Sequence, residues 1–204
     1  MTSWFFDHYY QKPVISAAEP ASWRFQIRAA TPDDLAGISQ IIAESFHAHD
    51  GFWGWAFPLL RLGIYEDLKH RLSSPAPHHV CLVAIDTTAA LNPTLVGTVE
   101  LGVRFNDSWV ATGRSFPYLS NLAVHPKYRR HGVASKLLTS CEKFSQEWGF
   151  EELYLHVLEN NDQARQLYLK LGYEVYKLES NWNKFFFRPA RQILLQKHLG
   201  IEVD

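Results

Sequence analysis

Apolar and polar positions follow two patterns of spacing along this chain, one typical of helices and one typical of strands. Apolar residues three or four positions apart predict amphipathic helices, and short apolar runs bounded by turn residues predict strands. The predicted helices are 31–46, 64–72, 133–148 and 162–171. The predicted strands are 25–29, 80–85, 95–104, 118–124, 153–158, 173–178 and 191–198. This order predicts a single mixed α/β sheet with helices on its faces.

The ends of the predicted helices carry signals of their own. Thr31 precedes Pro32 and two acidic residues, and this arrangement favours the start of a helix through side-chain capping and the helix dipole. Gly149 and Gly172 follow the third and fourth helices and predict their ends. Residues 1–23 are irregular but aromatic, so we expect an extension that lies on the domain rather than a free tail.

The composition indicates that the chain can bury a full core. Of its 204 residues, 47% are hydrophobic and 20% are charged, and the net charge is −1. Such a balance excludes a global basic field that would hold a nucleic acid or an anionic membrane. The sequence shows no apolar stretch long enough to span a membrane and no secretory signal near residue 1. We therefore expect a cytoplasmic protein with one domain.

Cysteine and histidine residues do not form a metal-binding pattern. The chain has 2 cysteines, Cys81 and Cys141, and they build no zinc framework. Cys141 lies on the apolar stripe of its predicted helix, so we expect it in the core rather than as a nucleophile. His78 and His79 are adjacent, but the sequence suggests no third ligand. We expect no metal.

The segment 119–135 carries the clearest chemical signal. A predicted strand runs into a loop with Arg129, Arg130 and Gly132, and a helix begins at once. The first amides of a helix have no intrahelical acceptor and lie at the positive end of its dipole, so such a turn binds phosphate. Gly132 lets the backbone approach a ligand closely, and the two arginines add positive charge. We expect a phosphate or pyrophosphate site here.

Residues 129–134, Arg-Arg-His-Gly-Val-Ala, resemble the R/Q-x-x-G-x-G/A signature of the GNAT superfamily of acetyl-CoA-dependent N-acetyltransferases. The segment Leu-Ala-Val-His-Pro before it and residues 160–168 after it agree with the same family. Ala134 stands where glycine is commoner. The resemblance implies a GNAT domain over 24–204. It also implies a mixed, mostly antiparallel sheet of six to seven strands, flanked by about four helices.

The resemblance also implies an acetyl-CoA site. In the family the pyrophosphate lies on the amides of the loop and helix start, and the preceding strand binds the pantetheine arm. An asparagine at the next helix start touches the cofactor, and a tyrosine of that helix lies near the thioester sulfur and serves the leaving thiolate. The corresponding residues here are Arg129, Arg130, His131, Gly132, Val133, Ala134 and Ser135 for the pyrophosphate, Leu122, Ala123 and Val124 for the pantetheine, then Asn161 and Tyr168.

Acetyl transfer also needs a base that takes a proton from the amine. The position of His156 alone favours an ordinary sheet histidine. However, its segment Tyr-Leu-His-Val is similar to NatE-type protein N-alpha-acetyltransferases, where the histidine acts through water with a tyrosine that corresponds to Tyr118. Glu100 is a rival base, because other branches of the superfamily place a carboxylate near it. In the similar bacterial ribosomal-protein alanine acetyltransferases, a glutamate stands at the position of His156.

The same resemblance implies a peptide substrate. Phe57, Pro58 and Leu59 match a Phe-Pro-aliphatic turn that cups the N-terminal residue of the substrate. Residues 181–184 resemble a loop that closes over the peptide, although Trp182 and an asparagine replace its tyrosines. The expected acceptor is therefore a protein N-terminal α-amine, with lysine ε-amines as a second class.

Two other functions stay open at this stage. A small-molecule acetyltransferase would act on a polyamine or an aminoglycoside-like amine. Such polycations favour a substrate site with an acidic entrance, whereas the first interhelical turn here is aromatic. A non-catalytic acetyl-CoA-binding module would not need Tyr168 and His156. The sequence is also similar to cyanobacterial and plastid members, so the plastid stroma is the expected compartment if the source is a plant. A monomer and a homodimer both fit.

Overall fold

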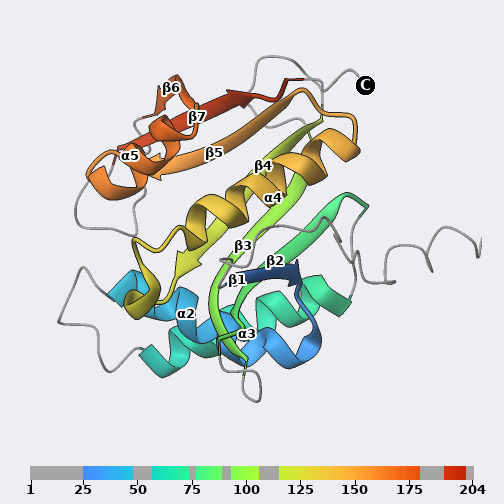
Figure 1. Ribbon diagram of the computed structural model, residues 1–204, viewed down its shortest axis with the longest axis vertical. Helices are drawn as coiled ribbons and strands as arrows, with labels where there is room; N and C mark the ends of the chain where they lie inside the picture. Colours follow the sequence, from blue (N-terminus) through green and yellow to red (C-terminus); the bar gives the residue numbers. More distant parts are fainter. Residues whose placement is uncertain are drawn as a thin grey trace, which may run out of the picture.

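The computed structural model describes residues 25–47, 57–73, 77–88, 93–105, 115–179 and 191–200. Its strands form one sheet in the order β1-β2-β3-β4-β5-β7-β6, which confirms the predicted fold class (Figure 1). The strands are β1 (Phe25–Ala29), β2 (His79–Asp86), β3 (Thr94–Arg104), β4 (Phe116–Val124), β5 (Glu152–Leu158), β6 (Glu174–Glu179) and β7 (Gln192–His198). The helices are α2 (Leu35–His47), α3 (Phe57–Ser73), α4 (Val133–Glu147) and α5 (Asp162–Lys170).

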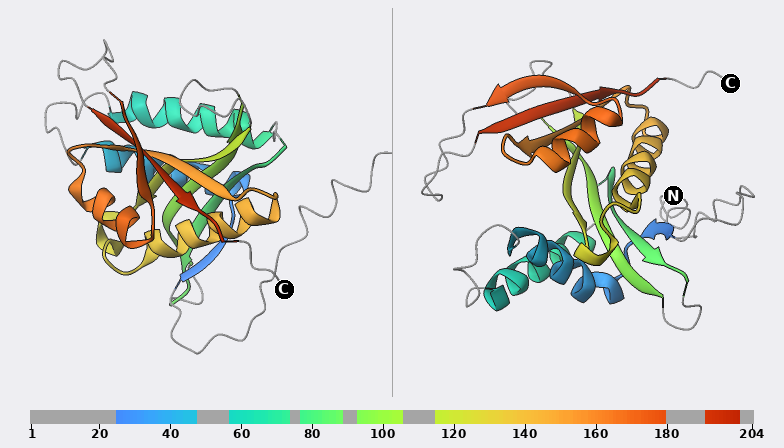
Figure 2. Two further views of the ribbon diagram at one scale, coloured as in Figure 1. Left: turned by 90° about the horizontal axis from the view of Figure 1, so that it is seen from above. Right: turned by 60° about the vertical axis from the view of Figure 1, so that its left-hand side comes forward.

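Strands β4 and β5 form the one parallel pair among the described strands, and all other neighbours run antiparallel. Two residue pairs join them, Tyr118 with Tyr154 and Leu119 with Leu155. Beyond these pairs the two strands diverge, so β1–β4 and β5–β7 form two parts of the sheet that run in different directions (Figure 2). Among the described strands, residues 120–124 therefore pair with β3 alone.

Helices cover both faces of the sheet, and burial of their apolar stripes drives the packing. Helices α2 and α3 cover one face, where the buried residues include Leu35, Ile38, Ile42, Leu68, Cys81 and Val83. Helices α4 and α5 cover the other face, where they include Leu82, Leu101, Leu137, Cys141, Leu155 and Tyr168. Both thiols are free and buried, and Cys141 lies in the core as expected. None of the described helices combines the length and the apolar character needed to cross a membrane.

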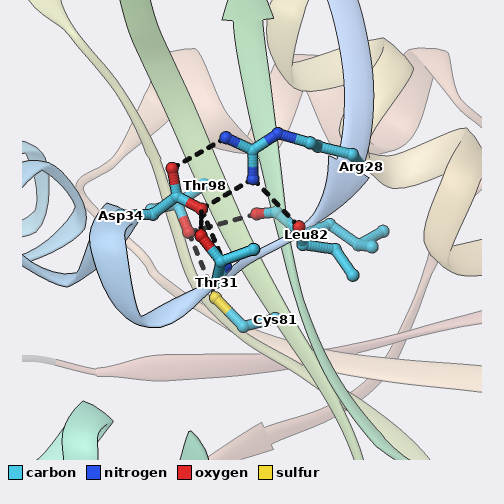
Figure 3. Close-up of polar contacts among 7 residues, drawn as sticks. Arg28, Thr31, Asp34, Cys81, Leu82 and Thr98 are labelled. Carbon is cyan, nitrogen blue, oxygen red and sulfur yellow. Dashed lines mark hydrogen bonds and ion pairs between the residues drawn. The ribbon is translucent and has the colours of Figure 1, made fainter. Parts of the chain in front are cut away.

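The start of α2 shows how an ion pair ties a helix to the sheet. A 3-10 turn, Pro32–Asp34, precedes the helix, and Thr31 is its cap residue, as predicted. The Asp34 carboxylate accepts a hydrogen bond from the Thr31 amide at 2.7 Å (Figure 3). It also accepts from two guanidinium nitrogens of Arg28, at 2.6 and 2.8 Å. Because Arg28 belongs to β1, this contact joins α2 to the first strand.

The structure corrects the boundary of the second helix. The sequence pattern predicts this helix over 64–72, after an aromatic turn, but α3 begins at Phe57. Pro58 lies in the first turn, where its missing N–H costs no intrahelical hydrogen bond and the helix is not broken. Gly63 lies inside the helix with open space at its Cβ position, so it costs only backbone entropy. Phe57, Pro58 and Leu59 are thus helical, and their side chains lie outside the described part of the structure.

Candidate active site

The loop between β4 and α4 is held in shape by its own polar contacts. A 3-10 turn, Pro126–Tyr128, follows β4, and α4 begins at Val133. Arg129 donates a hydrogen bond from Nε to the Val124 carbonyl at 3.2 Å. The His131 ring nitrogen Nδ1 lies 2.8 Å from the Arg129 carbonyl oxygen. These contacts fold the loop back onto the end of β4.

Gly132, at the start of α4, leaves room for a ligand. Its φ of 82° lies in the left-handed region, and no atom lies within 4 Å of the position a Cβ would take. The amides of Val133, Ala134 and Ser135 have no acceptor within the helix, whose first bond runs from the Lys136 amide to the Gly132 carbonyl. Open backbone, exposed arginines and the positive end of α4 fit the pyrophosphate of coenzyme A.

The end of β4 bends before it reaches this loop. Asn121 has a φ of 53°, and the register of β4 against β3 shifts between Ser120 and Ala123, which marks a β-bulge. No described strand pairs with residues 122–124 on the side of β5. The backbone N–H and C=O groups on that side can therefore bind an extended ligand, such as a pantetheine arm.

Helix α5 carries Asn161 as its cap residue and Tyr168 in its last turn. The Asn161 side chain caps the helix and accepts a hydrogen bond from the Ala164 amide at 3.2 Å. Tyr168 is buried and packs against Tyr173, with ring centroids 5.7 Å apart. Its hydroxyl makes no hydrogen bond within the described part of the chain. Burial, and next the nearby Tyr118, raises the pKa of Tyr168 to about 12.

Tyr118 and His156 meet at the point where β4 and β5 begin to separate. The Tyr118 hydroxyl lies 2.8 Å from His156 Nδ1, a hydrogen bond between two residues that are 38 positions apart. Tyr118 is buried and His156 is half-buried. The Arg104 guanidinium carbon lies 3.6 Å from the centre of the Tyr118 ring, a cation–π contact. A phenol and an imidazole in such a contact can exchange a proton, and this pair lies near the start of β4.

Glu100 lies on the same side of the sheet but is enclosed by other groups. It is opposite Ser120 on β4, two residues from Tyr118. Its side chain is 2% exposed and accepts hydrogen bonds from Arg71 of α3 at 2.7 Å and from Asn121 at 2.8 Å. The sequence analysis predicts a role for neither Arg71 nor Asn121. Asn121 did leave a signal, because a polar residue inside an apolar strand is typical of a bulge.

The residues expected to contact the substrate remain predictions. For Phe57, Pro58 and Leu59 the structure gives the backbone only, and Trp182 lies in 180–190, outside the described residues. In the described part of the chain, no three histidine, cysteine, aspartate or glutamate side chains gather in a way that could hold a metal ion. Of the predicted catalytic residues, the structure describes the side chains of Tyr118, His156 and Tyr168.

Comparisons with known sequences match these features. The profile of the Acetyltransferase (GNAT) family matches residues 38–173. The chain is 30% identical over 182 residues to the chloroplastic GCN5-related N-acetyltransferase 10 of Arabidopsis thaliana, across 82% of this chain and 69% of that protein. It is 35% identical over 86 residues to N-alpha-acetyltransferase 50 of Danio rerio, across 40% of this chain and 49% of that protein.

Solved structures share the fold. The ribosomal-protein-alanine N-acetyltransferase of Brucella melitensis has a TM-score of 0.65 at 20% identity, across 85% of this chain and 99% of that one. An acetyltransferase of Salmonella typhimurium, solved with its cofactor acetyl-CoA, has a TM-score of 0.64 at 17% identity, across 89% of this chain and 98% of that one. The chain belongs to the GNAT family of acetyl-CoA-dependent N-acetyltransferases, which confirms the family, the enzyme class and the cofactor predicted from the sequence.

Proposed function

We propose that this chain transfers the acetyl group of acetyl-CoA to the N-terminal α-amine of proteins, with lysine ε-amines as a second class of acceptor. The observation that carries the proposal is the 2.8 Å contact between Tyr118 and His156, at the point where β4 and β5 part. It agrees with the resemblance of both segments to NatE-type enzymes. A ribosomal-protein-alanine acetyltransferase among the similar structures supports a protein substrate.

Acetyl-CoA supplies an activated thioester, and the chain supplies its binding site. Amides from Arg129 to Ser135 at the start of α4 would hold the pyrophosphate, because they combine exposed donors with a positive helix end. The backbone of Leu122, Ala123 and Val124 would hold the pantetheine arm. Asn161 would complete the site from the start of α5, where its side chain is already fixed by the Ala164 amide.

His156 and Tyr118 would together remove the proton from the amine. An α-amine has a reference pKa of about 8, so a group that titrates near neutrality, such as imidazole, suffices as a base. The hydrogen bond between the Tyr118 hydroxyl and His156 Nδ1 would orient the imidazole and connect it, through water, to the amine. We assign the base to His156 rather than to Glu100, because the Glu100 carboxylate is enclosed and paired with Arg71.

Tyr168 would act on the leaving group. A phenol with a pKa of about 12 keeps its proton at neutral pH. Its hydroxyl can therefore donate a hydrogen bond to the thiolate as negative charge develops on the sulfur.

The test is acetyl-CoA turnover on a pooled library of peptides with free N-termini, scored by mass for α- and ε-acetylation. We expect α-acetylation that depends on the first residues of the peptide. His156→Ala should lower it about a hundredfold or more, the range of general acid–base catalysis. His198→Ala, a strand histidine that is 75% exposed on β7, is the matched control and should leave turnover unchanged. Untouched peptides beside an acetylated polyamine or aminoglycoside would refute the peptide assignment.

The compartment forms part of the same proposal. The sequence predicts the cytoplasm, or the plastid stroma for a plant source. The Arabidopsis thaliana relative is named as a chloroplast protein, and this supports the stroma for a plant chain. Expression of the full chain with a fluorescent tag in plant cells would show whether it enters plastids.

A further inference from the structure

The buried carboxylate of Glu100 connects one helix and two strands. It belongs to β3, and its Oε2 accepts hydrogen bonds from Nη1 of Arg71 on α3 and from Nδ2 of Asn121 on β4. The Ser120 hydroxyl lies 3.5 Å from the same oxygen. A charge this deeply buried needs pairing and hydrogen bonds, and Oε2 receives all of those named here. The other oxygen, Oε1, is buried and has no hydrogen-bond partner in the described part of the chain.

Asn121 is the member of this cluster that lies next to the proposed cofactor site. Its backbone is left-handed, at a φ of 53°, a conformation that asparagine adopts more readily than most residues with a side chain. It occupies the bulge at which β4 changes register against β3. The next residues, 122–124, are those that we propose for the pantetheine arm. The hydrogen bond from Asn121 to Glu100 therefore helps to set the direction in which β4 leaves the bulge.

The other partner of Glu100, Arg71, belongs to the helix that carries the residues proposed for peptide binding. Arg71 lies in the last turn of α3, and the first turn of the same helix holds residues 57–59, which we propose for peptide binding. Tyr118, the partner of His156, lies two positions before Ser120 and therefore on the same side of β4. One carboxylate thus joins the helix of the proposed peptide site to the strand that carries Tyr118 and the cofactor residues.

We propose that Glu100 is a positioning residue for acetyl transfer. Paired with Arg71, it holds Asn121 in the bulge and so aligns the end of β4 with acetyl-CoA. This role rests on the proposed function, because it presumes that residues 122–124 bind the cofactor. It differs from the role of a base, which would require a carboxylate that exchanges protons with the amine.

Two variants test the role by separate routes. Glu100→Gln keeps the size of the side chain but removes the charge that pairs with Arg71. Asn121→Gly adopts a positive φ without strain but lacks the amide that donates to Glu100. Calorimetric titration of each full-length variant with coenzyme A gives the dissociation constant, and thermal unfolding without ligand gives the stability. We expect coenzyme A to bind about tenfold more weakly to both, the factor for one hydrogen bond to a charged group.

Asp34→Asn is the matched control, since Asp34 ties α2 to the sheet through Arg28 as Glu100 ties α3 through Arg71. It should lower the unfolding temperature and leave the dissociation constant of coenzyme A unchanged. If Glu100→Gln and Asn121→Gly behave in the same way as this control, Glu100 is only a structural residue and the proposal is wrong. Should Glu100→Gln not fold, Asn121→Gly decides alone, because it keeps the pair with Arg71.

Failure of the proposed function gives a different result. A wild-type protein that binds coenzyme A but acetylates no peptide contradicts the peptide assignment, while the dissociation constants still test Glu100. A wild-type protein that does not bind coenzyme A overturns both proposals.

Discussion

Arg130 and Gly132 both adopt left-handed backbone conformations, with φ of 66° and 82°. Glycine takes this conformation without cost, but a residue with a Cβ is disfavoured there. The contacts of Arg129 and His131 within the chain support the loop in this shape. A loop that is ordered beforehand loses little conformational freedom on binding, and this favours affinity for the pyrophosphate.

Gly132→Ala should damage coenzyme A binding more than stability. The new Cβ would cost about 1–2 kcal/mol of stability, because alanine is strained at positive φ. It would also project into the open space proposed for the pyrophosphate, so we expect the dissociation constant to rise tenfold or more. Gly149→Ala is the matched control, because Gly149 has a φ of 83° and open space around it at the far end of α4. Equal dissociation constants in the two variants would contradict the assignment.

Tyr168→Phe should lower kcat with little change in coenzyme A binding. Phenylalanine keeps the contact with Tyr173 but removes the hydroxyl that we assign to the leaving sulfur. We expect kcat to fall about ten- to a hundredfold, the effect of one lost stabilising donor or less. Tyr173→Phe serves as the control: it removes a hydroxyl that donates to Glu142 at 3.3 Å and should change stability rather than kcat. Steady-state kinetics and calorimetry separate the two effects.

In the described part of the chain, a carboxylate–guanidinium pair ties each of the helices α2 and α3 to the sheet. Asp34 pairs with Arg28 on β1, and Glu100 on β3 pairs with Arg71. Burial would raise the pKa of Asp34, but the hydrogen bonds and charge of Arg28 and the hydrogen bonds of Thr31 outweigh it and lower the pKa below its ordinary value of 3.8. A carboxylate with a lowered pKa stabilises the fold only while it is ionised.

The contribution of Asp34 to stability should therefore depend on pH. It is fully present above the unfolded-state pKa near 3.8 and is lost as the pH falls through the lower folded-state pKa. At neutral pH we expect Asp34→Asn to cost about 1–3 kcal/mol, the value of hydrogen bonds to a charged group. Urea unfolding of both proteins from neutral pH down to about pH 3 should show the difference shrinking only below about pH 4. A difference that is constant over this range would contradict the assignment.

The helices and strands could be predicted from the sequence because their patterns are local. Apolar spacing and end signals found α4 and α5 within one residue of their observed ends. The start of α3 was wrong by seven residues: α3 begins at Phe57 and not at 64. Proline and glycine weaken the local pattern there, although the first turn and the open surface of the helix tolerate them.

The candidate site depended on less local information. The loop at Arg129–Gly132 is a continuous motif, so it could be read directly. The pairing of Tyr118 with His156 could be predicted only through the family resemblance. The sequence of a strand does not determine which residues of a parallel neighbour lie beside it. The partners of Glu100 could not be foreseen at all, since the hydrogen bond from Asn121 exists only once the bulge has formed.

At the scale of the whole molecule, the two parts of the sheet meet through two residue pairs. The proposed acetyl-CoA site draws residues from both, with β4 and α4 on one side and α5 on the other. A ligand held across this junction binds only the folded chain, so it must stabilise the fold by mass action.

Coenzyme A should therefore raise the unfolding temperature. At a concentration a hundred times its dissociation constant, the expected gain is about 2.7 kcal/mol. For a chain of this size that corresponds to a rise of roughly 5–10 °C in a thermal unfolding scan. Adenosine, which lacks the pyrophosphate and the pantetheine, is the control and should give a much smaller shift. Equal shifts for both compounds would argue against a site at the start of α4.

The parting of β4 from β5 also has a consequence for solubility. A row of backbone groups without a neighbouring strand is what the outermost strand of a sheet presents, and such rows attract strands of other molecules. Here the row lies in the middle of the sheet, along residues 122–124, where none of the described strands lies on the side of β5 and a bound cofactor is proposed to cover it. The cofactor-free enzyme would then be more prone to self-association than the cofactor-bound enzyme. Acetyl-CoA would therefore protect the protein from aggregation in addition to serving as the acetyl donor.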